Sequence, residues 1–411
     1  MNILIVSQYF WPENFRINDL AEGLVQRGHS VTVLTGRPNY PSGSLFDGYG
    51  TIFPFRESYA DARVQRVPLF PRGSGKGLRL ILNYASFAVS ASLLGPLMAP
   101  QKTDVIIVFE PSPITVGLPA MVLKATTGAP VFFWLQDLWP ESLSATGAVH
   151  SSVILKTVEL MVRWLYKGCD RILVQSRAFV PAVLRLGGDK NNTYYFPNSA
   201  ESVYRPVEVP ANAPEQALMP EGFRITFAGN VGAAQDFDTI ISAANLLKDR
   251  KDIHFIIIGD GRLMGHLKQS VQKLSLEENV HLLGRYPVER MPYFFSLSDA
   301  LLVTLKNDPI FSLTIPSKVQ SYLACGRPII AALEGEGARI IELAKAGLTC
   351  RTQDPSKLAD TVLSMYRLPR SVREEMGRKG RLLFLAEFER ESLLDKLENW
   401  FSDVVEGNHA R

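Results

Sequence analysis

The sequence contains little cysteine and little net charge, and each scarcity excludes a class of protein. Its 411 residues include three cysteines, Cys169, Cys325 and Cys350, which cannot all pair and do not have the spacing of metal ligands. A disulfide scaffold is therefore excluded, and a reducing cytoplasm is the expected compartment. The formal net charge is only +3, which is too close to neutrality for a nucleic-acid footprint. We expect no nucleic-acid partner.

The first residues also lack the features of a signal peptide. The segment from Met1 to Val6 has no basic residues before its apolar run and no small-residue cleavage site, so we expect a buried first strand. What the sequence does contain is 46% hydrophobic and 21% charged residues, which is the composition of a globular protein with sizeable cores. At this length two domains are expected.

Short apolar runs alternate with helical periodicity along the chain, which predicts α/β domains with parallel sheets. In the first half we expect strands at 2–6, 31–35, 105–109, 131–135 and 171–174, and a helix at 17–26. In the second half we expect strands at 224–227, 254–258, 280–283, 300–305 and 328–332, followed by charged helices. Each half is predicted to be a doubly wound domain, in which ligands bind at the carboxyl ends of the strands.

A proline-rich stretch without periodicity marks the boundary between the two halves. Four prolines fall between Tyr204 and Gly222, which is the composition of an interdomain linker. The predicted organisation is a first domain at 1–204, a linker at 205–222, a second domain at 223–385 and a final segment at 386–411.

Two glycine turns follow strands of the second half. They are Phe227-Ala228-Gly229-Asn230-Val231-Gly232 and Ile256-Ile257-Ile258-Gly259-Asp260-Gly261, and further on Pro316-Ser317-Lys318 opens a predicted helix. Glycine lets the backbone approach a ligand closely, and a following helix points unpaired N–H groups at an anion. Any α/β domain needs glycine at such turns, but the ordered set of two turns and a basic helix start indicates a diphosphate site.

This ordered set resembles the second half of the nucleotide-sugar glycosyltransferases of family 4, which have the GT-B fold. The first half is similar to the same family at Ser7 to Pro12, at Arg27 to Val33 and at Phe196 to Ser199. Three further motifs resemble the bacterial branch that builds O-antigen, capsule and colanic acid, and within it the N-acetyl-L-fucosamine transferases. They are Gln8-Tyr9-Phe10-Trp11-Pro12-Glu13, Arg37-Pro38-Asn39-Tyr40-Pro41 and Gln136-Asp137-Leu138-Trp139-Pro140-Glu141-Ser142.

The resemblance implies two Rossmann-like domains that face a cleft, the first for the acceptor and the second for the nucleotide sugar, with a helix around 388–401 that returns to the first domain. It also implies a retaining transfer of a sugar, such as N-acetyl-L-fucosamine, from a UDP-sugar to a polyprenyl-diphosphate-linked acceptor. The reaction is expected to need no metal and no cofactor, because helix N-termini and lysine stabilise the leaving diphosphate. Such an enzyme would work at the inner face of the cytoplasmic membrane, in lipopolysaccharide (O-antigen) or capsule biosynthesis.

The sequence departs from the family pattern at three places. The Arg and Lys with which most members hold the diphosphate are replaced by Asn230 and Gln235. The paired glutamates that bind the donor sugar and the ribose correspond to Leu313 and Ser321, and a histidine of the first-domain crevice corresponds to Gln136. These roles are not transferable to this chain. A non-catalytic nucleotide-sugar-binding protein and a UDP-sugar epimerase of related architecture therefore stay open as alternatives.

Lys318 and Lys306 are the candidates to replace the missing cations. A cation beside a helix N-terminus is a common way to hold a diphosphate, although an exposed lysine is usually only a solvated charge. Tyr286 could stack on uracil or simply pack in its loop. The residues expected to bind the donor are Asn14, Arg16, Gly229, Asn230, Gly232, Gln235, Gly259, Arg285, Tyr286, Lys306, Pro316, Ser317, Lys318 and Ser321.

Asp137 directly follows the apolar run 131–135, at the crevice end of a predicted strand. Its carboxylate could accept the proton of an acceptor hydroxyl or orient that hydroxyl, or it could cap the following helix. We expect Asp137 and Lys318 to be catalytic. The residues expected to bind the acceptor are Arg37, Asn39, Tyr40, Glu110 and Glu141.

Two long apolar stretches of the first half lie beside basic residues. Segment 78–99 follows Arg72 and Lys76, and segment 154–167 contains Lys156, Arg163 and Lys167 together with Trp164 and Tyr166. The first stretch is long enough to cross a bilayer, but polar residues interrupt it. We therefore favour two helices that lie in the membrane interface, and the alternative is two ordinary helices packed on the sheet.

Overall fold

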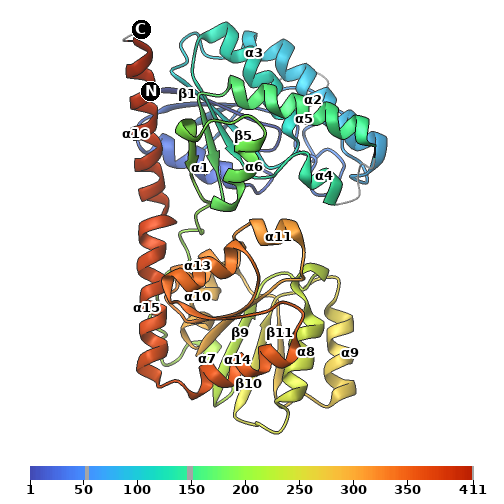
Figure 1. Ribbon diagram of the computed structural model, residues 1–411, viewed down its shortest axis with the longest axis vertical. Helices are drawn as coiled ribbons and strands as arrows, with labels where there is room; N and C mark the ends of the chain where they lie inside the picture. The colour runs from blue at the N-terminus through green and yellow to red at the C-terminus, as the bar shows by residue number, and fades with distance from the viewer. Residues whose placement is uncertain (51–54, 146–150, 410–411) are drawn as a thin grey trace. The chain divides into compact units, whose positions relative to one another are not determined.

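The computed structural model describes residues 1–50, 55–145 and 151–409, and it divides into two compact units (Figure 1). Unit 1 comprises Met1–Pro197 and Leu393–Arg411, and unit 2 comprises Asn198–Ser392. Each unit is an α/β layer structure with a parallel sheet in the middle, as the alternation of apolar runs and helical periodicity predicts. The chain therefore leaves unit 1, builds unit 2, and returns.

Unit 1 is built on a mostly parallel sheet. Its strands are β1 (Asn2–Ser7), β2 (Ser30–Thr35), β3 (Phe55–Tyr59), β4 (Ala62–Arg66), β5 (Val105–Glu110), β6 (Val131–Leu135), β7 (Arg171–Val174) and β8 (Thr193–Tyr195). Its helices are α1 (Arg16–Gln26), α2 (Gly77–Met98), α3 (Gly117–Thr127), α4 (Glu141–Ala145), α5 (Ser152–Gly168), α6 (Val180–Arg185) and most of α16 (Arg390–His409). The strand order is β3-β4-β2-β1-β5-β6-β7-β8, in which β3 runs antiparallel to β4.

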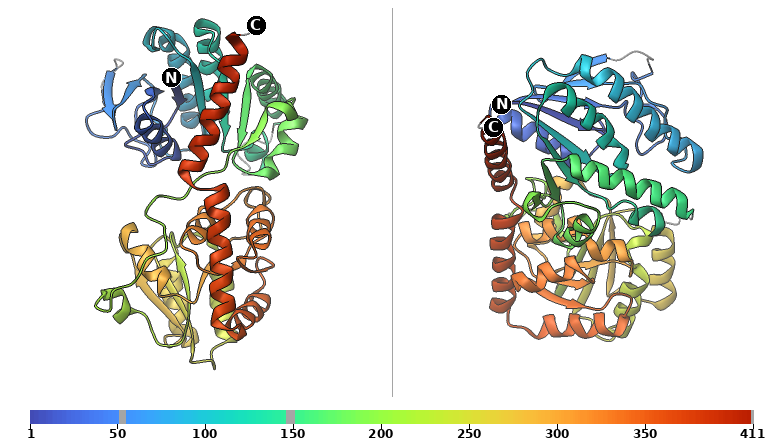
Figure 2. Two further views of the ribbon diagram at one scale, coloured as in Figure 1. Left: turned by 90° about the vertical axis from the view of Figure 1, so that its left-hand side faces the viewer. Right: turned by 45° about the horizontal axis from the view of Figure 1, so that its top comes forward.

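Helices cover both faces of this sheet because successive strand residues point to opposite sides. On one face, Ile3 and Ile107 are buried in a cluster with residues of α1 and α16. On the other face, Gly95 of α2 lies against Leu34, and Gly117 of α3 lies against Phe133. Figures 1 and 2 show α2, α3 and α5 together on the face opposite α16. The chain order reverses between β1 and β5, so the loops after these strands are where a ligand is expected.

Unit 2 is built on a parallel sheet with the order β11-β10-β9-β12-β13-β14. Its strands are β9 (Phe223–Ala228), β10 (Ile253–Ile258), β11 (Val280–Gly284), β12 (Ala300–Thr304), β13 (Ile329–Ala332) and β14 (Gly347–Cys350). Its helices are α7 (Pro214–Leu218), α8 (Phe237–Leu246), α9 (Met264–Leu274), α10 (Met291–Ser296), α11 (Pro309–Leu313), α12 (Ser317–Ala324), α13 (Glu336–Ala344), α14 (Pro355–Arg367) and α15 (Arg370–Glu387). This is the strand order of a dinucleotide-binding fold, and its order reverses between β9 and β12.

The proline-rich stretch after Tyr204 does not behave as a free linker. The Tyr204 ring stacks on Phe295 with centroids 6.1 Å apart, and the Ser296 hydroxyl donates to Val207 O at 2.9 Å. Within α7, the buried Glu215 carboxylate accepts from Arg290 at 2.6 Å. The whole stretch therefore belongs to unit 2, and the division falls earlier, between residues 197 and 198. Proline content located an irregular segment but not the boundary.

The predicted helix around 388–401 is α16 (Arg390–His409), and a break at residues 388–389 separates it from α15. Phe388 lies in the break between α15 and α16 and is fully buried in unit 2. In α16, Leu394, Leu397 and Phe401 are buried in the core of unit 1. The chain thus returns to unit 1 through α16. The predicted segment 386–411 includes residues 410–411, which lie outside the described residues.

Candidate active site

The two glycine turns meet at the carboxyl edge of the unit 2 sheet. Gly229 follows β9, and Gly259 follows β10. Val231 N donates to Asp260 O at 2.9 Å, which joins the two turns. Gly259 has φ 144, and a Cβ there would lie 1.8 Å from Gly229 O. Only glycine fits at this position, so both turns present bare backbone at the point where the strand order reverses.

Lys318, in the first turn of α12, lies beside Gly229. A Cβ on Gly229 would lie 3.0 Å from the Lys318 Nζ. The ammonium donates to Gln235 Oε1 at 3.0 Å and lies 4.8 Å from the centroid of the Phe227 ring. Burial lowers the pKa of Lys318 to about 8, because a low-dielectric environment penalises the charged form. Within the described residues no carboxylate offsets this penalty. An anionic ligand would therefore stabilise the charged ammonium.

The 3-10 turn η4 (Ala233–Gln235) links both candidate lysines to the first glycine turn. Lys306 N donates to Ala234 O at 2.9 Å, and the Thr304 hydroxyl donates to Gln235 O. The Lys306 side chain is exposed. The structure therefore places Lys306, Lys318 and Gln235 around one short loop.

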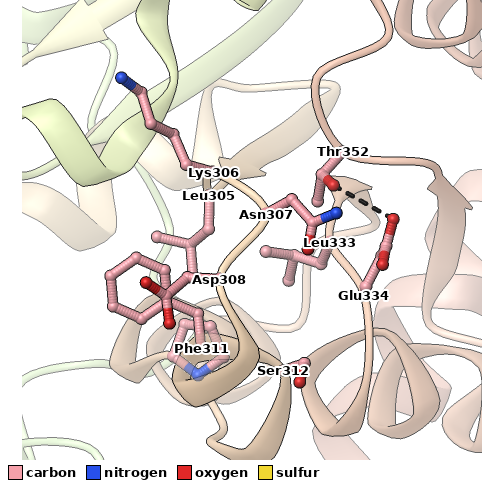
Figure 3. A pocket seen from close by; sticks show the side chains of 10 residues that line it. Leu305, Lys306, Asn307, Asp308, Phe311, Ser312, Leu333, Glu334 and Thr352 are labelled. Carbon is pink, nitrogen blue, oxygen red and sulfur yellow. Dashed lines mark hydrogen bonds between the residues drawn. The ribbon is translucent and has the colours of Figure 1, made fainter. Parts of the chain in front are cut away.

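A small pocket lies next to Lys306, beyond the ends of β12 and β13 (Figure 3). In Figure 3 the Lys306 ammonium points away from this pocket, whereas Glu334 and Thr352 face each other across a hydrogen bond of 3.2 Å. Its volume of about 10 Å³ suits a single water molecule. This pocket does not hold a sugar.

The other expected donor residues divide into accessible and engaged side chains. Asn230 and Arg285 are exposed. The Tyr286 ring packs edge to face on Phe294 with centroids 4.8 Å apart, which favours loop packing over stacking on a base. Ser321 is buried, and its hydroxyl donates to Ser317 O at 3.1 Å, so it is not open to a ribose hydroxyl. The remaining expected donor residues take these places: Gly232 ends the first glycine turn, Pro316 is the N-cap of α12, Asn14 is exposed in the loop before α1, and Arg16 begins α1.

Asp236-Phe237-Asp238 has the spacing of a metal-binding Asp-x-Asp motif, and the sequence analysis overlooked it. The Asp236 side chain is buried, whereas Asp238 is exposed and pairs with His266 at 3.2 Å. The two carboxylates therefore lie in different surroundings. No cluster of three metal-binding side chains occurs among the described residues, and this motif does not form one.

Asp137 lies at the carboxyl edge of the unit 1 sheet, directly after Gln136, the residue that follows β6. Its Oδ1 accepts hydrogen bonds from Leu138 N at 2.9 Å and from the Ser142 hydroxyl. Ser142 belongs to α4, so the second bond ties Asp137 to the helix that follows it. Burial raises the pKa of Asp137 above its usual range. Because Asp137 Oδ1 already accepts these two hydrogen bonds, Oδ2 is the oxygen that could accept a hydrogen bond from a substrate.

Glu110 is the neighbour of Asp137 at the end of β5. It is completely buried, and its Oε2 accepts from Asp137 N at 3.4 Å. Burial and, second, the charge of Asp137 raise the pKa of Glu110 well above its usual range. A completely buried carboxyl supports the Asp137 loop and is not open to an acceptor from solvent, so that expectation is corrected. Glu141 is ion-paired with Arg185.

Arg37 and Asn39 are buried as well, so their expected contact with an acceptor is also corrected. The Asn39 side chain is 0% exposed, its Nδ2 donates to Arg37 O at 2.9 Å, and its Oδ1 accepts from Arg72 N at 3.0 Å. These groups hold two loops of unit 1 together. Tyr40 differs, because its side chain is 39% exposed. The Arg72 guanidinium lies over its ring, with Cζ 5.1 Å from the ring centroid. Of the three residues of this motif that were expected to bind the acceptor, Tyr40 is the accessible one.

Glu13 and Ser112 lie at the same edge and were missed by the sequence analysis. The buried Glu13 carboxylate accepts from Asn39 N at 2.8 Å and Tyr40 N at 2.7 Å, and burial raises its pKa to about 7. Ser112, just beyond Glu110, has φ 102, a strained conformation that clusters at functional sites. Glu13 belongs to a quoted motif, but its burial is set by a loop distant in sequence.

The chain is similar to known glycosyltransferases in both units. The glycosyl transferase 4-like domain family matches residues 14–199, and the glycosyl transferases group 1 family matches residues 222–367. WcaI of Escherichia coli K12, named a glycosyl transferase of colanic acid biosynthesis, is 27% identical over 79% of this chain and 82% of its own length. WbjE of Pseudomonas aeruginosa, also named a glycosyltransferase, is 27% identical over 80% of this chain and 86% of its own length.

Solved structures share the two-domain fold. HepE of Anabaena in complex with UDP has a TM-score of 0.70 and 15% identity, covering 98% of this chain and 100% of that one. Sucrose-phosphate synthase of Thermosynechococcus elongatus has a TM-score of 0.72 and 16% identity, covering 98% of this chain and 99% of that one. At these identities the likeness concerns the fold alone. The prediction of two Rossmann-like α/β domains is confirmed.

Proposed function

We propose, from the premise that this chain belongs to the family 4 glycosyltransferases of the GT-B fold, that it moves a sugar from a UDP-sugar to a saccharide carried on polyprenyl diphosphate. The observation that carries the donor half of this proposal is Lys318. Its half-buried ammonium lies against the bare backbone of Gly229, and within the described residues it lacks a carboxylate partner. A diphosphate supplies the charge that this setting favours.

The relatives support the substrate classes without fixing the sugar. Structures of HepE hold UDP and UDP-glucose, which favours a uridine nucleotide as the donor. WcaI is named for colanic acid biosynthesis, and TuaH of Bacillus subtilis, 23% identical over 49% of this chain, is named for teichuronic acid biosynthesis. Both names concern bacterial surface polysaccharides. The motifs that resemble those of the N-acetyl-L-fucosamine transferases lead us to propose an N-acetylated amino or deoxy-amino sugar.

The proposed transfer retains the configuration at the anomeric carbon. The bond between that carbon and the diphosphate oxygen breaks, and UDP leaves with the electron pair. The acceptor hydroxyl attacks from the same side, and its proton passes to the departing diphosphate oxygen. Lys318 and the glycine backbone would stabilise the negative charge that develops on the leaving group. With these groups in place, we propose that no metal ion is required.

Asp137 is the proposed group for the acceptor hydroxyl. Its Oδ1 is held by Leu138 and Ser142, which fixes the direction of the carboxylate and leaves Oδ2 to orient the hydroxyl. Glu110, behind it, is proposed as a positioning residue. Preorganisation of this kind lowers the barrier because the carboxylate does not have to be ordered during the reaction.

The test is product analysis. The purified protein is incubated with a panel of UDP-sugars and a short polyprenyl-diphosphate saccharide, with and without EDTA, and the products are identified by mass spectrometry and the new linkage by NMR. We expect one extended acceptor, retained configuration and no effect of EDTA. Epimerised sugar without an acceptor would establish the epimerase alternative instead. UDP-sugar binding without any product would establish the non-catalytic one.

A further inference from the structure

Unit 1 exposes an apolar surface on the helices opposite α16, and this surface, formed by the outward sides of α2 and α5, is called the apolar face below. On α2, Leu78 and Leu93 are 70% exposed and Leu97 is 80% exposed. On α5, Leu160 and Trp164 are more than half exposed. Helix α3 packs against both α2 and α5, which makes the three helices one layer (Figures 1 and 2). Large apolar side chains gathered in this way mark an interaction surface.

The inner side of α2 fixes how this helix lies on unit 1. Asn83 is completely buried, donates to Phe70 O at 2.6 Å and accepts from Gln8 Nε2 at 2.7 Å. Phe87, Ala91 and Gly95, each one helical turn further on, are buried as well. Helix α2 has the length and hydropathy of a membrane span, but the buried stripe from Asn83 to Gly95 packs it on unit 1. Its exposed stripe therefore lies parallel to the surface of the unit.

The charges around the apolar face are mostly basic. Lys76 and Arg79 lie at the start of α2, and Lys156 and Lys167 lie on α5, all exposed. Helix α2 contains no acidic residue. The acidic residue of α5, Glu159, accepts from Arg163 at 2.8 Å. An apolar stripe with lysine and arginine at its rim and a tryptophan among its residues matches an anionic lipid surface, in which the ring lies at headgroup level.

We propose that the apolar face docks this protein on an anionic lipid bilayer, with α2 and α5 lying in the headgroup region and their leucines and Trp164 inserted into the acyl boundary. The docking itself is argued from exposure and charge. It deepens the proposed function in one respect, because a polyprenyl-linked acceptor would then reach the enzyme from the same membrane. A second copy of this chain is the competing occupant of the face.

The test is flotation of the whole chain with vesicles of phosphatidylcholine and phosphatidylglycerol, and with vesicles of phosphatidylcholine alone. The wild type is expected to float with the anionic vesicles and to lose part of its binding as salt screens the basic residues. Leu93→Ser and Leu97→Ser should each lower the partition coefficient about tenfold, because each removes an apolar side chain that the bilayer would otherwise bury. Lys76→Ala and Arg79→Ala should each lower it about fivefold.

The matched controls are Leu343→Ser and Leu382→Ser in unit 2. These leucines are 62% and 52% exposed, but they lie on α13 and α15, so their replacement should leave flotation unchanged. Trp164 gives an independent signal: tryptophan fluorescence of the wild type should shift to shorter wavelength on anionic vesicles, and Trp164→Phe should lose most of that shift. Equal flotation of the wild type and the Leu93→Ser, Leu97→Ser double variant would overturn the proposal.

Two further measurements separate the remaining outcomes. Sedimentation without lipid tests whether a second copy of this chain occupies the apolar face. If the wild type is a dimer and Leu93→Ser and Leu97→Ser dissociate it, the face is assigned to a second copy. UDP binding by the double variant should equal that of the wild type, since both leucines belong to unit 1 and the glycine turns belong to unit 2. If transfer fails while flotation holds, only the proposed function fails. If transfer to a water-soluble acceptor succeeds while the protein never floats, only the docking surface fails.

Discussion

At the scale of the residue, the donor site depends on one half-buried ammonium. Lys318 is held by Gln235 and lies over the Phe227 ring, so its position is set before a ligand arrives. A cation held without a carboxylate costs folding free energy. That cost is consistent with a group kept for binding and not for stability.

Replacement of Lys318 by alanine should therefore affect turnover more than folding. We expect kcat/KM to fall. The loss of transition-state stabilisation should be about 2 to 4 kcal/mol, as for other preorganised charge stabilisers. The melting temperature should stay the same or rise, because a half-buried charge without a carboxylate partner is removed. The measurement is steady-state kinetics beside calorimetry, and Lys306→Ala is the matched control. Wild-type turnover in Lys318→Ala would transfer the role to Lys306.

The lowered pKa of Lys318 also predicts a pH dependence of UDP binding. The ammonium is charged below its pKa of about 8 and neutral above it, whereas the bound diphosphate favours the charged form. The affinity should thus be constant at lower pH and fall as pH rises through this value, by up to about tenfold per pH unit. Titration calorimetry in buffers of different ionisation enthalpy would detect the proton taken up on binding at high pH.

Lys318→Arg is the control for this pH dependence, because arginine stays charged across the range. Whatever affinity that variant keeps should not fall above pH 8. A flat profile for the wild type would show that Lys318 does not contact the diphosphate.

At the scale of the element, the two glycine turns act as one structure. Gly259→Ala places a Cβ 1.8 Å from the backbone oxygen of Gly229 at a φ of 144, so one turn must move. We expect loss of UDP binding and destabilisation of unit 2 by about 3 kcal/mol. Gly265→Ala is the control, because that helical glycine has nothing within 4 Å of a new Cβ. Since alanine has the higher helix propensity, this variant should raise the free energy of unfolding by up to about 1 kcal/mol. Urea unfolding of both variants compares them.

The sequence predicted the elements that are locally encoded. The run Phe255–Ile258 is continuously apolar, so its burial in a parallel sheet is visible from composition. The hairpin β3–β4 was missed because its edge strand Phe55–Tyr59 contains Arg56, Glu57 and Ser58 and therefore has no apolar run. The glycine turns and Lys318 were predicted for the same local reason. The burial of Glu110 and Asn39 could not be predicted, because loops distant in sequence cover them.

At the scale of the whole molecule, the two units share a chain in which unit 1 is discontinuous. Phe401, near the end of the chain, is 0% exposed and meets the Phe132 ring edge to face with centroids 4.9 Å apart. Its packing links the last helix to a central strand of unit 1. The stability of unit 1 therefore depends on residues that follow unit 2 in the sequence.

Phe401→Ala should destabilise unit 1 by about 3 to 5 kcal/mol, the usual cost of a cavity left by a buried phenylalanine. Calorimetry should show a lower melting temperature for one transition. UDP should raise the other transition, which assigns that one to unit 2. Asp403→Ala, an exposed position in the same helix, is the control and should change little. A shift of the UDP-sensitive transition in Phe401→Ala would contradict this assignment.

The return of the chain through α16 also sets an order of events during synthesis. Residues 1–197 are synthesised first, but one face of the unit 1 sheet stays uncovered until Leu394, Leu397 and Phe401 have been synthesised. Unit 2 is contiguous and is complete as soon as residue 392 has emerged. The nascent chain should thus finish its second unit before its first, the reverse of the usual N-terminal-first order. An uncovered apolar sheet in the interval is a binding site for a chaperone.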